Sequence, residues 1–151
     1  MQRIYFLIVG FMLTGAAFAQ EKKINRSELP PAVEKTVVQQ SNGATIRGFS
    51  EEKENGQTTY EVEMIVNGHS KDVQMDANGA VIGIEEQIDL ETLPADVRAG
   101  LQAKAAEGNI TKVESITKKD KLVAYEAQIV TGGKKSEVQV GPDGKPLDYE
   151  E

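Results

Sequence analysis

Hydrophobic and polar residues alternate with a period of two in two widely separated stretches, YEVEMIV at residues 60–66 and YEAQIV at residues 125–130. Such alternation is typical of a β-strand with one buried face, because successive side chains point to opposite sides of a sheet. The dipeptides Asn67-Gly68 and Gly132-Gly133 follow the two stretches and favour the two-residue turns of β-hairpins. Alternation resumes after each turn, so each stretch predicts an antiparallel hairpin.

A helical period precedes each hairpin. Val97, Leu101 and Ala105 recur at the spacing of one helix face, and Val33 and Val37 do the same more weakly. Helices of this length are unstable in isolation, so each is expected to lie on a sheet. A further strand is expected before each hairpin, near residues 45–50 and 111–116.

The two halves of the chain repeat one pattern at a nearly constant offset. The matched positions are Leu29-Pro30 with Leu93-Pro94, at an offset of 64, and Tyr60-Glu61 with Tyr125-Glu126, Val73-Gln74 with Val138-Gln139 and Gly79 with Gly144, at an offset of 65. Agreement at this many ordered positions indicates a tandem duplication. The sequence therefore predicts an α+β fold of two tandem repeats, residues 20–87 and 88–151, each a short helix packed on a three- to four-stranded antiparallel sheet.

Residues 1–19 have the composition of a secretory signal peptide. Arg3 gives a positive start, residues 4–13 are apolar apart from Gly10, and Ala17-Phe18-Ala19 supplies the small residues of a cleavage site. The apolar run is well short of the roughly 20 residues that cross a bilayer as a helix. The chain has no cysteine, which a lipoprotein signal requires. We expect cleavage after Ala19 and a periplasmic or secreted protein that is not a lipoprotein and keeps no membrane span.

Composition narrows the partners that such a protein can have. Removing 19 residues from 151 leaves 132, with 16 basic and 24 acidic residues and a net charge of −8. Nucleic acids and anionic membranes both reward clustered lysine and arginine, so neither is an expected partner. Without cysteine the mature chain must be stabilised by packing or by joining its halves rather than by disulfides.

The order of motifs in each half resembles the PepSY-like proteins of bacterial periplasms and the related repeat of the β-lactamase inhibitor proteins. The motifs are a leading Leu-Pro, the Tyr-Glu-Val strand at residues 60–62, a glycine turn, a short apolar strand and a closing Asn-Gly or Asp-Gly. The resemblance covers nearly all of residues 20–151, once per half. It implies an exported, non-catalytic protein, since some PepSY domains accompany proteases as inhibitory elements and the inhibitor proteins grip an enzyme across the sheets of two tandem units.

The chain departs from the inhibitor proteins in the residues that would make an interface. It has no tryptophan and no disulfide, and its aromatic residues after position 19 are Phe49, Tyr60, Tyr125 and Tyr149. Interface hot spots are enriched in Trp, Tyr and Arg. Inhibition of a β-lactamase in particular is therefore not predicted, and the target stays open.

Catalytic and metal-binding groups of the usual kinds are scarce. A hydrolase needs a nucleophile beside a base, or a paired acid and base, and zinc takes several histidine or cysteine ligands. The chain has one histidine, His69, which falls in a predicted turn. We expect no enzyme, no cofactor and no zinc site.

Carboxylates crowd the polar face of the predicted strands. This face is either a solvated surface kept charged against stacking on other sheets, or a patch that attracts a basic protein surface. The contact candidates are Glu61, Glu63, Asp72, Asp76, Glu126 and Tyr149. The leading hypothesis is an exported non-enzymatic binding module, an inhibitor or modulator of another envelope protein. The alternative is an acidic, calcium-responsive envelope protein that uses the same carboxylates.

Overall fold

The structure is a computed structural model that describes residues 20–54 and 56–147, and the strands of this part of the chain form one antiparallel sheet. The elements in chain order are β1 (Gln20–Ile24), α1 (Pro31–Gln40), β2 (Thr45–Glu54), β3 (Gln57–Val66), β4 (His69–Asp76), β5 (Val81–Gln87), α2 (Ala95–Ala105), β6 (Asn109–Lys118), β7 (Lys121–Thr131) and β8 (Lys134–Val140), with 3₁₀ turns at Arg26–Glu28 and Leu90–Thr92. The predicted signal peptide and Tyr149 lie outside the described residues.

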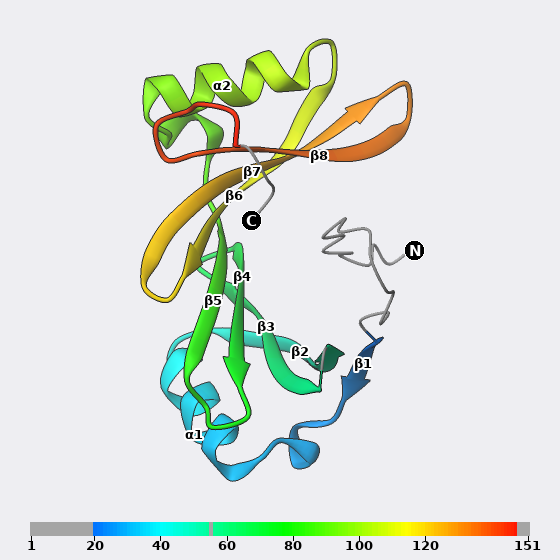
Figure 1. The fold of residues 1–151 in the computed structure, drawn as a ribbon, viewed down its shortest axis with the longest axis vertical. Coiled ribbons are helices and arrows are strands. Elements are labelled where there is room, and N and C mark those ends of the chain that lie inside the picture. Colours follow the sequence, from blue (N-terminus) through cyan, green and yellow to red (C-terminus); the bar gives the residue numbers. More distant parts are fainter. Residues whose placement is uncertain (1–19, 55, 148–151) are drawn as a thin grey trace.

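The sheet has eight strands in sequential order, and this overturns the expected fold of two tandem units with a separate small sheet each (Figure 1). Residues 83–87 of β5 pair antiparallel with residues 114–118 of β6, which joins the two halves into one ladder. Alternation within each half predicts strands but leaves an outer strand with unpaired N–H and C=O groups. Pairing the two outer strands satisfies both sets, and local sequence patterns carry no sign of that choice. The predicted division between residues 87 and 88 falls at the end of β5 and stays a prediction.

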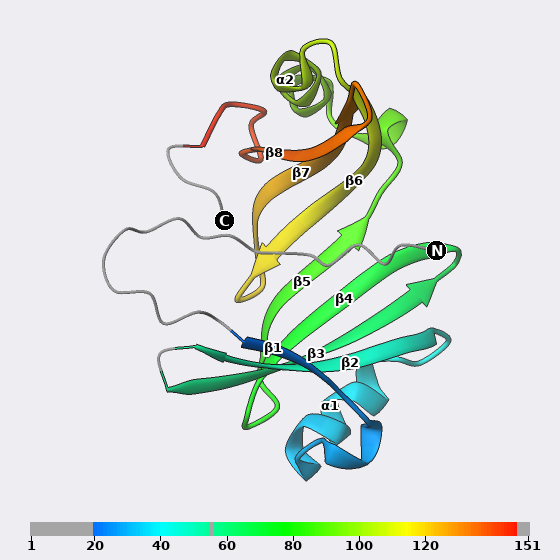
Figure 2. The same ribbon diagram turned by 90° about the vertical axis from the view of Figure 1, so that its right-hand side faces the viewer.

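Both helices lie on the outer face of a strongly bent sheet, α1 over the first strands and α2 over the last (Figure 2). The predicted helical stripes are confirmed as core. Val33 and Val37 of α1 are buried in one hydrophobic cluster, and Val97 and Leu101 of α2 are buried in another. The strand residues that meet them come from the alternating apolar face and are Tyr60, Val62, Met64, Val73 and Met75 in the first cluster and Val113, Ala127 and Val140 in the second.

The turns follow the glycine pattern of the sequence. Asn67 and Gly68 have φ angles of 51° and 89°, the left-handed values that the predicted hairpin turn requires. Gly79 and Gly144 are also left-handed, and a Cβ at either would collide with the backbone of a helix, at Ala32 and Asp96 respectively. These two turns therefore press directly on the first turns of α1 and α2.

Candidate functional site

The inner face of the bent sheet, which we call the concave face, carries a row of carboxylates across five strands. Glu63 of β3 pairs with Asp72 of β4, and Asp72 pairs in turn with Glu85 of β5. Farther along, Glu114 of β6 pairs with Glu126 of β7. Side chains that are directly opposite on antiparallel strands lie about 5 Å apart, so the register alone brings like charges together.

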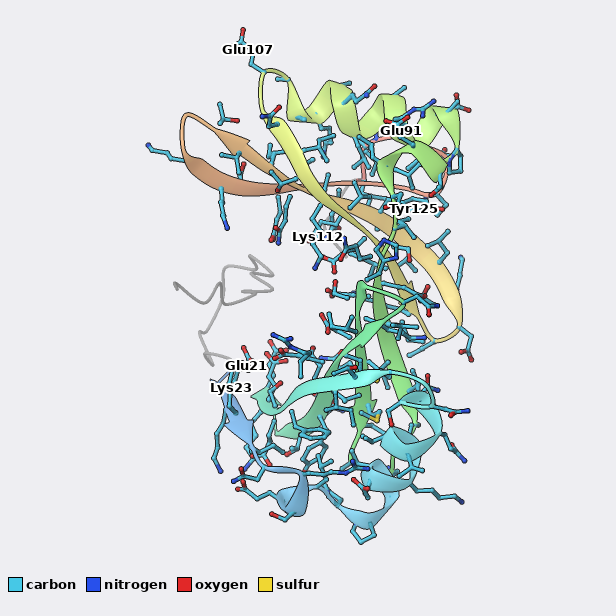
Figure 3. All side chains as sticks on the ribbon, turned by 180° about the vertical axis from the view of Figure 1, so that it is seen from behind. Glu21, Lys23, Glu91, Glu107, Lys112 and Tyr125 are labelled. Atoms are coloured by element: carbon cyan, nitrogen blue, oxygen red, sulfur yellow. The ribbon has the colours of Figure 1, made fainter. Side chains whose placement is uncertain are left out.

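A cavity of about 600 Å³ opens on the concave face over strands β1 to β6. Its acidic lining residues are Glu21, Glu52, Glu61, Glu63, Asp72 and Glu85, and its cationic ones are Lys23, Arg47 and Lys112. In Figure 3, Glu21 and Lys23 of β1 and Lys112 of β6 lie on the side where the bent sheet opens, whereas Glu91 and Glu107 lie on the outer side with α2. The cavity is thus a predominantly acidic hollow.

Burial on this face works against the ionised form of its carboxyls. Burial raises the pKa of Glu61 to about 8, and the charges of Asp72 and Glu85 add to the effect. Burial raises the pKa of Glu85 to about 7, with further contributions from Glu114 and Glu126. Burial also raises the pKa of Asp72 to about 6, helped by Glu114 and opposed by Lys112. These carboxyls therefore keep their protons to a higher pH than ordinary carboxyls, and a cation that entered the concave face would favour their ionised forms.

A few contacts compensate part of this charge. Lys112 lies 2.5 Å from the carboxylate of Glu114, whose side chain is only 3% exposed. The Gln139 amide donates a hydrogen bond of 2.8 Å to Glu126. Lys23 makes a 3.4 Å ion pair with Glu63 at the exposed edge. Lys112 also acts on the middle of the row, because its charge opposes the rise in the pKa of both Asp72 and Glu85.

Three of the carboxylates have a spacing that a metal ion could use. Asp72, Glu85 and Glu114 each offer one oxygen, and these oxygens lie within 4.8 Å of one another. Calcium takes oxygen ligands at about 2.3–2.6 Å, so ligands on opposite sides of one ion are separated by about this distance. Among the described residues, these three carboxylates form a group with the spacing that a calcium ion needs.

The predicted contact residues separate into two groups. Glu61, Glu63 and Asp72 line the cavity, and Glu126 continues the same face toward β8. Asp76 stabilises the turn after β4, because one of its carboxylate oxygens accepts hydrogen bonds of 2.9 Å from the N–H groups of Asn78 and Ala80. The description of the face as solvated does not fit its centre, since Glu114 is 2% exposed.

Two residues of the row, Glu85 and Glu114, were absent from the sequence prediction. Glu85 follows Ile84 on a strand, and strict alternation places it on the polar face, so the pattern could have found it. Glu114 was harder to place because the ladder between β6 and β7 is irregular near Ile110 and again near Ile116. Such irregularities break the two-residue period that sequence reasoning depends on.

His69, the residue considered for catalysis and metal binding, lies at the first position of β4. Its Nε2 atom is 3.3 Å from the carboxylate of Asp89. It is not among the residues that line the cavity. Among the described residues, no helix has both the length and the apolar character needed to cross a membrane.

No protein-family model and no curated protein matches the chain. Solved structures do resemble it. A Bacteroides eggerthii protein described as periplasmic has a TM-score of 0.65 and 16% identity over 81% of this chain and 88% of its own. A DUF2874 family protein of Bacteroides ovatus has a TM-score of 0.61 and 17% identity over 81% and 86% of the two chains. A BLIP-like protein of Bacteroides fragilis has a TM-score of 0.58 and 20% identity over the same shares.

These likenesses concern the fold. At identities of 16–20% they show that the chain has the architecture of the DUF2874 and BLIP-like proteins. The predicted resemblance to the β-lactamase inhibitor fold is confirmed at that level, and the assignment to the PepSY-like proteins stays a prediction.

Proposed function

We propose that the protein is an exported, non-enzymatic binding module of the periplasm that contacts another envelope protein through its concave face. The observation that carries this proposal is the acidic cavity of about 600 Å³, in which six carboxylates outnumber three cations. The periplasmic assignment is supported by the signal-like residues 1–19 and by the fold shared with a protein described as periplasmic.

The chemistry of the concave face favours a basic partner. Carboxyls such as Glu61 and Glu85 are held in a partly buried, mutually repulsive arrangement. A lysine or arginine side chain entering the cavity would replace this repulsion by attraction, and a guanidinium could bind a carboxylate through two hydrogen bonds. Charge complementarity of this kind gives specificity and a fast association rate. Such a module would inhibit or modulate the protein that it binds.

Affinity capture followed by purified binding tests the proposal. Tagged residues 20–151 would serve as bait in an envelope extract of the source organism, beside the variant Glu61→Lys/Glu63→Lys. Glu91→Lys/Glu107→Lys is the matched control, because it makes the same charge change at exposed positions on the outer side (Figure 3). We expect a captured protein whose affinity falls at least about tenfold in the first variant and stays unchanged in the second. Equal affinity for both variants, with both folded by circular dichroism, would contradict the proposal.

The export step is tested independently of the partner. Amino-terminal sequencing of the protein from a periplasmic fraction should begin at Gln20. Recovery of the full-length chain in the cytoplasmic fraction would overturn this part of the proposal.

Calcium binding is a second candidate function, favoured by the 4.8 Å grouping of Asp72, Glu85 and Glu114. Calorimetric titration with calcium would then give saturable heat with a micromolar dissociation constant, and Asp72→Asn would abolish it. Asp120→Asn, at an exposed turn, is the control for the loss of one negative charge. Absence of heat in the unsubstituted protein removes this candidate and leaves protein binding in place.

A further inference from the structure

The first strand, β1, is attached to the molecule more weakly than its neighbour β2, which is paired on both sides. Its described side chains Glu21, Lys22 and Lys23 are exposed, and Ile24 is only partly buried. As an edge strand it has one neighbour, β2, through five paired positions. Local opening costs least where few apolar side chains are buried and the backbone hydrogen bonds are open to water.

Electrostatics weaken the attachment of β1 further. Glu21 lies directly opposite Glu52 of β2, a like-charge pair of the kind that destabilises a sheet. Glu21 also adds to the negative charge around Glu61 in the cavity. Two ion pairs oppose the detachment of β1, Lys23 with Glu63 and Lys22 with Glu28, each at 3.4 Å. Both are largely exposed and so contribute little.

The chain is firmly anchored immediately after β1. The backbone N–H of Asn25 donates a 2.8 Å hydrogen bond to Glu28, which closes a capping box on the following 3₁₀ turn. Arg26 binds Glu34 of α1 at 2.7 Å, and Leu29 is buried in the first hydrophobic cluster. Any detachment of β1 therefore stops near Asn25, which defines a hinge.

This weakly held strand forms part of the cavity wall. Glu21, Lys23 and Ile24 all line the cavity, and Lys23 pairs with Ser50 of β2, which is only 4% exposed. Ser50 lines the same cavity, so detaching β1 would widen the opening of the cavity and remove the neighbouring strand from one side of Ser50.

We propose that β1 is a strap, hinged at Asn25, that opens to admit the partner into the acidic cavity and closes once a cationic group occupies it. The coupling rests on the proposed function, while the opening of β1 does not. A cation in the cavity replaces the repulsion of Glu21 by Glu52 and Glu61 with attraction, so occupancy favours the closed strap. By linkage, a partner that binds the closed strap more tightly than the open one shifts the strap towards closure by that same affinity ratio.

Thiol labelling measures the opening directly, because the chain has no cysteine of its own. In Ser50→Cys the new thiol lies on β2 directly beside β1, at a cavity-lining position that is 4% exposed, and in the control Ala127→Cys it lies at a 0% exposed position between β6 and β8 beneath α2. We expect the Ser50→Cys thiol to react at least about a hundredfold faster, at a rate that low urea leaves unchanged. Equal labelling rates with the same steep dependence on urea would mean that both thiols react only after global unfolding. This result would overturn the proposal that β1 opens as a strap.

Two further substitutions test whether charge controls the opening of β1. Glu21→Gln in the Ser50→Cys background should slow labelling several-fold, and Lys23→Gln should accelerate it. Opposite or equal effects would show that charge does not control β1. Hydrogen exchange of the unsubstituted chain is the control for a packing defect caused by Ser50→Cys. The amides of residues 21–24 should exchange far faster than those of β3. Equal protection of the two sets of amides would also overturn the proposal.

A lysine-rich peptide serves as the cationic probe for the coupling. It should slow both the labelling of the Ser50→Cys thiol and the hydrogen exchange of the amides of residues 21–24, and leave the labelling of the Ala127→Cys thiol unchanged. Because Ser50 lines the cavity, slower labelling without slower exchange would mean that the peptide only shields the thiol, and would overturn the coupling. Fast labelling that the peptide does not slow would overturn the coupling while β1 still opens. Failure of the proposed function is seen elsewhere, in unchanged capture by Glu61→Lys/Glu63→Lys.

Discussion

The two faces of the sheet are built from alternate residues of the same strands, yet they have opposite effects on the stability of the fold. On the outer face, Val62 and Val73 are fully buried beneath α1. On the concave face, the neighbouring Glu61 and Asp72 are largely withdrawn from water without an apolar environment that suits them. The outer face stabilises the fold by burying apolar area. The concave face costs stability, and costs of this kind are typical of surfaces kept for function.

The contrast also extends to how each face tolerates change. Packing on the outer face is close, so removal of atoms leaves cavities. The concave face has open volume and excess negative charge, so removal of a charge relieves repulsion. Substitutions on the two faces should therefore shift the free energy of unfolding in opposite directions.

The largest effect is expected from the core beneath α2. Leu101→Ala removes a fully buried side chain and should lower the free energy of unfolding by about 2–5 kcal/mol, measured by urea denaturation. Val38→Ala on α1 is the control, because Val38 is 55% exposed and should change stability by no more than about 0.5 kcal/mol. Similar losses in both variants would mean that α2 does not depend on this contact.

The next effect concerns the turns that press on the helices. Gly79→Ala adds a Cβ that collides with the backbone of Ala32 and also strains a left-handed residue, so a loss of about 2–3 kcal/mol is expected. Gly68→Ala isolates the strain, because Gly68 is left-handed with nothing within 4 Å of its added Cβ. A loss at Gly79 no greater than that at Gly68 would show that the turn does not contact α1 closely.

The dependence of the free energy of unfolding on pH should reveal the raised pKa values of the carboxyls on the concave face. Carboxyls whose pKa is raised by folding bind protons more tightly in the folded chain, so their contribution to stability is fully present below the ordinary carboxyl range and is lost as pH rises through the raised pKa values. The loss should follow the pKa values of about 6 for Asp72, about 7 for Glu85 and about 8 for Glu61. Each extra proton of the folded state contributes about 1.4 kcal/mol per pH unit, and screening at the open cavity should reduce the total to about 2 kcal/mol between about pH 5 and pH 8.5.

Urea denaturation across this pH range measures the effect. Glu28 and Asp143 have lowered pKa values and act in the opposite sense, but only in the acid range below about 4.5. A stability that stays constant or rises between about pH 5 and pH 8.5 would show that folding does not raise the pKa values of these carboxyls.

The smallest effect is a gain. Glu61→Gln removes one charge from the concave face and should raise the free energy of unfolding at about pH 8.5 by about 1 kcal/mol, with little change at about pH 5. Glu91→Gln, whose side chain is 83% exposed, should change it by less than about 0.5 kcal/mol at either pH. A loss of stability in Glu61→Gln at high pH would mean that the ionised carboxylate of Glu61 is stabilised by its surroundings.

Local features of this protein were largely determined by its sequence. The hairpin turn at Asn67-Gly68 and the buried helix stripe of Val97, Leu101 and Ala105 are present as predicted. Such features depend on neighbours a few residues apart, whose periodicity and turn chemistry are visible in the chain. The polarity of the concave face follows from the same alternation.

Only the tertiary structure decided how these pieces combine. The pairing of β5 with β6 made one sheet where two were expected, and it is this pairing that brings Glu114 beside Asp72 and Glu85. The raised pKa of Glu61 depends likewise on Asp72 and Glu85, which belong to the neighbouring strands β4 and β5. Periodicity determines on which face of its own strand a side chain lies. Burial and charge density depend instead on which strands become neighbours. Strand pairing is determined by hydrogen bonds between the backbones of outer strands that are far apart in the sequence.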